Sequence, residues 1–205
     1  MRLEVFTGGP FETNSYLLIS EKKNALIVDP TFGSAPFFIE AVQRLQLHPC
    51  AILLTHSHID HIADVSEVKK AFEIPVFIHP LDQENLIHPG SDGLIFGDRI
   101  EGVVPDKLVE GGQMIECKDF RCQVIHTPGH SRGSVCFYFE HERVLISGDT
   151  LFKGTHGNVS FPGSDPAQMK LSLKRLAQLP KETVVYPGHA APTTIGAEQW
   201  IGGIT

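Results

Sequence analysis

Residues 55–61, Thr-His-Ser-His-Ile-Asp-His, place four side chains that can bind metals within six positions. These side chains are His56, His58, Asp60 and His61. The apolar residues 51–54 before them indicate a buried strand, and residues 62–72 after them have a helical pattern. The cluster is therefore expected on a turn between a strand and a helix, where a rigid scaffold presents side chains to a cleft. Neutral imidazole and carboxylate groups together favour zinc, iron or manganese.

Three later segments each place one further ligand just after an apolar strand pattern. The ligands are His130 in residues 124–130, Asp149 in residues 144–150 and His189 in residues 184–189. Strand ends on one edge of a sheet can assemble a rigid site. With the first cluster they supply five histidines and two aspartates, enough for two metal ions that share a carboxylate and a hydroxide. A metal pair roughly 3.5 Å apart lowers the pKa of its water to about 7 and stabilises an oxyanion, so this set of residues predicts hydrolysis.

The composition is that of an ordinary globular protein. The chain has 205 residues, 41% hydrophobic and 20% charged, so it can form one sizeable core, and we expect a single domain over residues 1–205. A formal net charge of −7 argues against a general nucleic-acid binder. The N-terminus lacks the apolar stretch of a signal peptide and no run is long enough to span a membrane, which predicts a cytoplasmic location. Free thiols in or near the core are expected for Cys50, Cys117, Cys122 and Cys136.

Apolar periodicity predicts two groups of strands, with helices between and after them. The expected strands are residues 3–6, 15–20, 25–28, 51–54 and 76–78, then 114–117, 121–126, 134–139, 143–146 and 183–186. The expected helices are residues 34–47, 62–72, 164–178 and 196–200. Residues 89–106 are predicted to form an irregular surface segment, because glycine and proline interrupt every period. This order predicts two sheets packed together with helices outside.

Taken together, these motifs resemble the metallo-β-lactamase superfamily. The shared pattern is His56-x-His58-x-Asp60-His61, followed by His130, Asp149 and His189. The surrounding Thr-Pro-Gly-His, Gly-Asp-Thr-Leu-Phe and Tyr-Pro-Gly-His sequences are most similar to the glyoxalase II-like branch. The resemblance extends from residues 14–16 to residues 192–196. It implies an α/β fold, a four-layer αββα sandwich, and metal-dependent hydrolysis.

The resemblance also implies how the ligands are divided between two divalent ions, most simply zinc, with iron or manganese as alternatives. One ion would be held by His56, His58 and His130. The other would be held by Asp60, His61 and His189. Asp149 would bridge the two ions. Asp29 would hold a metal-binding side chain in place without binding the metal itself, or would only be a turn residue before Pro30.

Other branches of the superfamily differ at recognisable positions. Flavodiiron proteins carry glutamate at the position of His58. Zinc β-lactamases usually lack the aspartate that matches Asp149 and are exported. RNA-processing members add basic surfaces or further domains. The chain shows none of these traits, so the resemblance favours the glyoxalase II-like branch.

The segment after Asp149 departs from the glyoxalase II pattern. Asn158 stands where the family commonly has lysine or arginine, and Ser160 where some members have a tyrosine that helps to bind glutathione. An amide pairs with a carboxylate less strongly than a cation does, so weak binding of glutathione thioesters is expected. Lys153 and His156 are the candidates to replace the missing cation. Because the sequence continues only briefly after His189, we expect no C-terminal helical domain.

Three hypotheses follow from the residues and the resemblance. In the first, a hydroxide that bridges two metal ions attacks a small-molecule thioester or ester, and Asp60 accepts a proton. In the second, the protein is a persulfide dioxygenase with one iron held by His56, His130 and Asp149. In the third, it is a non-catalytic metal-binding domain. No nucleic acid or membrane is expected as a partner, and the sequence does not indicate an oligomeric state.

Overall fold

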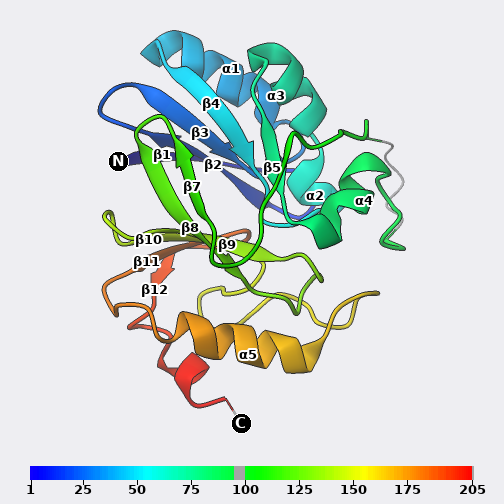
Figure 1. Ribbon diagram of the computed structural model, residues 1–205, viewed down its shortest axis with the longest axis vertical. Helices are drawn as coiled ribbons and strands as arrows, with labels where there is room; N and C mark the ends of the chain where they lie inside the picture. Colours follow the sequence, from blue (N-terminus) through cyan, green and yellow to red (C-terminus); the bar gives the residue numbers. More distant parts are fainter. Residues whose placement is uncertain (95–99, 205) are drawn as a thin grey trace.

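The computed structural model describes residues 1–94 and 100–204, which form four layers in the order helix, sheet, sheet, helix (Figure 1). Each layer of strands is a six-stranded sheet, and the two sheets are formed by consecutive halves of the chain. The predicted α/β sandwich with two central sheets is therefore confirmed. The prediction of a single domain over residues 1–205 stays a prediction.

The first sheet has its strands in sequence order, β1-β2-β3-β4-β5-β6. They are β1 (Arg2–Gly8), β2 (Thr13–Ile19), β3 (Asn24–Val28), β4 (His48–Leu53), β5 (Val76–Ile78) and β6 (Lys107–Leu108). The pairs from β3 to β6 are parallel, and helices α1 (Ser34–Leu45) and α3 (Val65–Phe72) pack on the outer face. Strands covered on both faces need apolar side chains on both, which explains why residues 51–54 are an unbroken apolar run.

The second sheet has the order β12-β11-β10-β9-β8-β7. Its strands are β7 (Met114–Cys117), β8 (Phe120–His126), β9 (Val135–Phe139), β10 (Val144–Gly148), β11 (Val184–Pro187) and β12 (Thr193–Thr194). Only the β10–β11 pair is parallel among the described strands of this sheet. Helix α5 (Pro166–Leu176) and the 3-10 helix η2 (Gln199–Gly202) cover its outer face (Figure 1).

Successive residues of a central strand pack in different apolar clusters. In β4, Ile52 packs in the cluster under α1 and α3, while Leu53 packs between the two sheets. The inter-sheet cluster receives Val124 and Phe137 from the second sheet. Because side chains alternate across a strand, one short apolar segment holds both neighbouring layers in place. The strand ends that carry the predicted ligands are fixed by this packing.

The helix predicted at residues 62–72 is wrong in its extent. The structure has two helices there, α2 (Ile59–Ile62) and α3 (Val65–Phe72). At the break, the Asp64 carboxylate accepts the N–H of Ala35 (2.9 Å) at the start of α1, and the Asp64 N–H donates to the Pro30 carbonyl (3.0 Å). The Asp64 side chain therefore caps the start of α1, a contact that the apolar period could not indicate.

Other helix ends differ from the prediction by one or two residues. Helix α1 ends at Leu45, because Gln46 adopts a left-handed conformation with φ 53°. Its N-cap is Gly33. Helix α5 begins at Pro166, two residues later than predicted, since Asp165 is its N-cap and accepts hydrogen bonds from the N–H groups of Ala167 and Gln168 (2.8 and 3.0 Å). The predicted helix at residues 196–200 is the 3-10 turn η2 instead.

Short elements were missed because they contain too few residues for a period. They are β6, β12, the 3-10 helix η1 (Pro80–Asp82) and helix α4 (Gln83–Ile87). The predicted irregular segment has no helix or strand at residues 89–94 and 100–106, and residues 95–99 lie outside the described part. All four cysteines are free thiols, as predicted. None of the described helices combines the length and the apolar character that a membrane span requires.

Candidate metal centre

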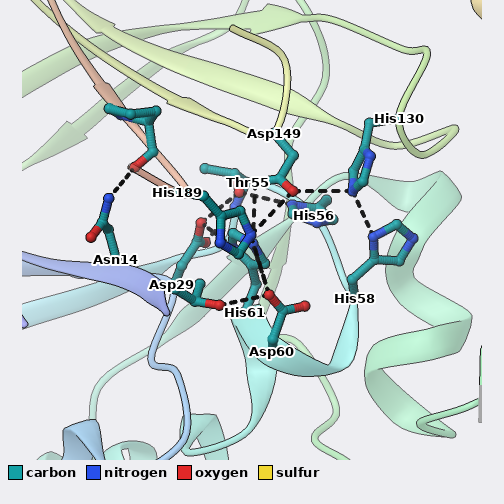
Figure 2. A network of polar contacts seen from close by, with 12 residues as sticks. Asn14, Asp29, Thr55, His56, His58, Asp60, His61, His130, Asp149 and His189 are labelled. Carbon is teal, nitrogen blue, oxygen red and sulfur yellow. Dashed lines mark hydrogen bonds and ion pairs between the residues drawn. The ribbon is translucent and has the colours of Figure 1, made fainter. Parts of the chain in front are cut away.

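The predicted ligands meet at one end of the two sheets, where strands β4, β8, β10 and β11 all terminate (Figure 2). The loop after β4 carries His56 and His58, and α2 carries Asp60 and His61. From the second sheet, the other three ligands come from the segments that follow β8, β10 and β11, respectively His130, Asp149 and His189. All but His189 are buried. Packing of the sheets thus brings together side chains as far apart in sequence as residues 56 and 189.

The seven side chains form two groups that share a carboxylate. The ligand atoms of His56, His58 and His130 lie within 4.8 Å of one another, as do those of Asp60, His61 and His189. Asp149 lies between the groups: its Oδ1 is 3.3 Å from His61 Nε2, and its Oδ2 is 3.3 Å from His130 Nε2 and 3.4 Å from His189 Nε2. The resemblance groups the same residues, and the binding of one ion by each group stays a prediction.

We call His56, His58, Asp60 and His61 the first half of the centre, and His130, Asp149 and His189 the second half. Asp29 positions the first half through its side chain. Its Oδ2 lies 2.9 Å from His61 Nδ1 and accepts the Thr55 hydroxyl at 2.5 Å, while Oδ1 accepts the Thr55 N–H at 2.8 Å. The Thr55 Oγ1 is in turn 3.1 Å from His56 Nδ1. One buried carboxylate therefore fixes two imidazoles, and the orienting role expected of Asp29 agrees with this geometry.

The histidines of the second half are fixed by main-chain oxygens. His130 Nδ1 lies 2.7 Å from the carbonyl oxygen of Asn158, and His189 Nδ1 lies 3.0 Å from that of Phe11. These contacts engage Nδ1 and leave Nε2 directed at the shared Asp149 (Figure 2). His58 differs, since its Nδ1 faces His130 Nε2 at 2.8 Å and is the atom available as a ligand.

The donor set fits divalent metal ions. Three buried polar atoms of the described residues have no hydrogen-bond partner and belong to this cluster: His56 Nε2, His61 Nε2 and Asp149 Oδ1. Leaving buried polar atoms unpaired costs free energy, so a group of them needs a partner of another kind. Nitrogen and carboxylate donors that converge in this way suit a cation such as Zn²⁺, Fe²⁺ or Mn²⁺.

Without a cation, protons neutralise part of the negative charge in the cluster. Burial opposes protonation of His61, but Asp60 and Asp149 outweigh it and raise the pKa of His61 well above its ordinary value. Burial also opposes protonation of His189, yet hydrogen bonds to Asp149 and Asp60 raise its pKa to about 9. A metal ion would compete with these protons for the same nitrogen atoms.

Two other ligands, His58 and Asp60, are held in the state that metal binding requires. Burial and the neighbouring His130 lower the pKa of His58 to about 3, so the imidazole is neutral. Burial would favour a neutral Asp60, but the charge of His61 and the hydrogen bond with His189 lower its pKa to about 2. Neutral imidazole and ionised carboxylate are the metal-binding forms of both side chains.

Two glycines are required by close approach at the centre. A Cβ at Gly188 would clash with Asp149 Oδ1 and lie 2.7 Å from His61 Cε1. A Cβ at Gly157 would clash with the Asp149 carbonyl oxygen and lie 3.0 Å from His130 Nδ1. The sequence contained a signal for Gly188, in the Tyr-Pro-Gly-His motif, but its reason is visible only in the structure.

Of the three residues predicted to bind substrate, Asn158 contacts a metal ligand, and it does so through its main chain. The Asn158 main chain contacts His130, but its side-chain Oδ1 accepts the N–H of Ser160 at 2.7 Å. His156 Nδ1 is 2.8 Å from the Gly157 carbonyl, and its ring lies 6.4 Å from that of Trp200 in η2. Lys153 is exposed. A role for these side chains in substrate binding stays a prediction.

Sequence reasoning missed two supporting residues of the loop after β4. The Thr13 hydroxyl donates to Asp60 Oδ2 at 2.6 Å. Asp82 accepts the Ser57 N–H at 3.0 Å and the Ser131 hydroxyl at 2.8 Å, and so ties this loop to the segment that carries His130. Neither residue lies in a recognisable motif, because each acts across a large sequence separation.

Comparison with known proteins agrees with this geometry. The family described as “Metallo-beta-lactamase superfamily” matches residues 8–189. The chain belongs to this superfamily. Membership, together with the histidine and aspartate groups, supports a hydrolase that depends on divalent metal ions.

Two solved structures and one named relative are similar to this chain over nearly its whole length. BLEG-1, a B3 metallo-β-lactamase, is 38% identical with a TM-score of 0.90, and 96% of each chain is covered. TTHA1623 in a di-iron-bound form is 37% identical with a TM-score of 0.81, over 95% of this chain and 96% of that one. The hydroxyacylglutathione hydrolase GloC of Haemophilus influenzae is 29% identical over 97% of this chain and 95% of its own.

Proposed function

We propose that this chain hydrolyses a thioester or a similarly activated small ester and that it uses two divalent metal ions. The position of Asp149 carries this proposal, because its two oxygens each lie 3.3 Å from a histidine Nε2 of a different group. A carboxylate between two sets of nitrogen donors is what a shared ligand requires. The di-iron form of TTHA1623 supports two ions, and the similarity to GloC supports a thioester substrate.

The ligands divide between the ions as the two groups of side chains suggest. His56, His58 and His130 would hold one ion, and Asp60, His61 and His189 the other, with Asp149 shared. When bound, divalent cations of this kind supply Lewis acidity at a carbonyl group and activate water. Zinc is the ion that we propose first, with iron or manganese as alternatives. The hydrogen bonds of Asp29, Thr55 and the Asn158 main chain hold the imidazoles in place for this chemistry.

Asp60 is proposed to accept a proton from the attacking water as well as to bind metal. Its Oδ2 accepts the Thr13 hydroxyl at 2.6 Å and lies 3.4 Å from His189 Nε2. Because its pKa is lowered to about 2, the carboxylate is ionised at neutral pH and can receive a proton, although it is a weak base. Thr13 holds the carboxylate in one orientation while the proton is transferred.

Metal analysis combined with a substrate panel tests this function. Protein loaded with zinc, iron or manganese is analysed for metal content and is assayed with thioesters, simple esters and β-lactams. We expect two ions per chain and turnover of thioesters. A single ion under metal-replete conditions would contradict the binuclear centre. Turnover of β-lactams alone would favour a second function, which the similarity to BLEG-1 suggests. Oxygen consumption with glutathione persulfide would favour the dioxygenase.

A further inference from the structure

A cavity of about 330 Å³ adjoins the metal centre on the side of His58. Ser57 and His58 line it from the loop after β4, and Pro162 and Gly163 line it from the segment before α5. His58 is thus both a proposed ligand and part of the cavity wall. A molecule bound in this cavity would lie beside the proposed reaction centre.

Arg132 is the only arginine or lysine among the described residues that line this cavity. Its side chain is exposed, and a Cβ at Gly163 would lie 3.8 Å from its Nε, so the side chain lies beside the cavity lining at Gly163. Arg121 lies 3.5 Å from Glu116, whereas the Arg132 guanidinium has no ion pair with any residue that the structure describes. It therefore offers a free, planar cation to an occupant of the cavity.

The backbone that carries Arg132 is held on both sides. Asp82 accepts the Ser131 hydroxyl (2.8 Å) and the Gly133 N–H (2.7 Å), and the Arg132 carbonyl oxygen lies 3.0 Å from His126 Nε2. A Cβ at Gly133 would lie only 2.5 Å from Asp82 Oδ1, so this turn needs glycine to pack so closely. Because the backbone is fixed, only the side chain has to be ordered when a ligand binds.

Two of the three carboxylates that line the cavity are engaged by hydrogen bonds within the protein. Asp82 makes the contacts to the Arg132 turn, and Asp92 accepts the N–H of Leu94 (2.9 Å) and an Asn85 amide N–H (3.0 Å). Glu84 is mostly exposed to solvent, 3.9 Å from His88. These acidic groups therefore do not form a prepared site for a cationic ligand. The positive charge in the cavity is that of Arg132, which makes no ion pair with a described residue.

We propose that Arg132 selects substrates that carry a carboxylate, by pairing with that carboxylate in the cavity beside His58. This inference rests on the proposed function. It adds that the substrate carries a negative charge and that Arg132 recognises this charge. It also moves anion recognition from Lys153 and His156 to the cavity beside His58. Arginine suits this role because its two parallel N–H donors match the geometry of a carboxylate.

Matched thioesters test the selection. Glutaryl and pentanoyl thioesters of N-acetylcysteamine differ by a carboxylate on the acyl side, and pentanoyl 3-mercaptopropionate carries the carboxylate on the thiol side. With Arg132→Gln, we expect KM for one or both carboxylate substrates to rise about five- to tenfold, with little change in kcat, because a remote ion pair contributes uniform binding. The neutral thioester should be unaffected, and Arg132→Lys should recover part of the loss. Arg121→Gln is the control for loss of a surface cation.

Binding of stable analogues separates this inference from the proposed function. Thioethers in which a methylene replaces the carbonyl are titrated calorimetrically into metal-loaded wild type and variants. Tighter binding of a carboxylate thioether that is lost in Arg132→Gln supports the inference, even if no thioester is hydrolysed and the proposed function falls. Equal binding by wild type and Arg132→Gln, or no preference of wild type for the carboxylate thioethers, would overturn the inference, even if thioesters are hydrolysed.

Discussion

The two halves of the metal centre are built in different ways. Four of the seven proposed ligands come from six consecutive positions between β4 and the end of α2, whereas the other three follow three separate strands of the second sheet. The first half needs only a strand, a turn and the start of a helix. The second half needs β8, β10 and β11 to end at the same edge. The site can therefore be recognised from a local sequence motif, but the packing of the second sheet supplies its other three ligands.

The same difference extends to the groups that orient the histidines. In the first half these groups are side chains, since Asp29 holds His61 and Thr55 holds His56. In the second half they are carbonyl oxygens of the main chain, at Asn158 and Phe11. Support by a side chain depends on the residue type, whereas support by a carbonyl depends only on the path of the backbone. Substitutions should therefore affect the two halves unequally.

Removal of the shared ligand should have the largest effect. Asp149→Ala leaves both groups of donors without the carboxylate between them, so metal occupancy and turnover should both fall. The loss should exceed the roughly 10- to 100-fold typical of losing a residue that only orients a ligand. Elemental analysis and the thioester assay measure the two effects, with the exposed Asp119→Ala as a control. A variant that kept two ions and the full rate would show that Asp149 is not shared.

A matched pair of substitutions compares the two kinds of support. Asp29→Ala removes the partner of His61 and should weaken metal binding by about 10- to 100-fold. Asn158→Ala keeps the carbonyl that contacts His130, so its metal affinity should change by less than about twofold. Competition with a chromogenic chelator gives both affinities. Equal losses in the two variants would mean that the Asn158 side chain supports the centre in a way that the contact to Ser160 does not explain.

Removal of metal should destabilise the fold moderately. A ligand present at 100 times its dissociation constant adds about 2.7 kcal/mol to the free energy of unfolding, or roughly 5–10 °C in Tm for a chain of this length. Differential scanning calorimetry before and after chelation measures the change. Hydrogen exchange should increase more around residues 127–131 than in residues 55–61, because side chains still hold the first loop. An unchanged Tm after verified metal removal would contradict the coupling.

Metal uptake should release protons, which is the smallest of these effects. In the metal-free protein, His61 and His189 have raised pKa values, and His189 titrates at about 9. Both imidazoles are therefore protonated at pH 7 and must lose a proton to bind metal, so the apparent affinity should fall as the pH falls. Calorimetric titration of zinc in two buffers with different ionisation enthalpies counts the protons. No proton release at pH 7 would show that these imidazoles are already neutral.

The sequence was sufficient for the parts of the site that depend on local chemistry. It predicted the order of the longer strands and helices, and it singled out His56, His130 and the other proposed ligands from residue type and position after strands. It could not reveal Asp82, whose partners Ser57 and Ser131 lie far away in the chain. The binding of substrate by Lys153, His156 and Asn158 stays a prediction, since a family pattern shows where a cation is missing but not where the side chains that could replace it lie.

The contact between His130 and the Asn158 carbonyl has a consequence for engineering. A carbonyl oxygen is present whatever the residue, so saturation libraries at Lys153, His156 and Asn158 should yield many metal-loaded variants. An insertion or deletion between Asp149 and Asn158 would instead shift that oxygen out of register with the imidazole. This segment should therefore tolerate changes of composition and resist changes of length, which makes it a place to graft new side chains but not new loops.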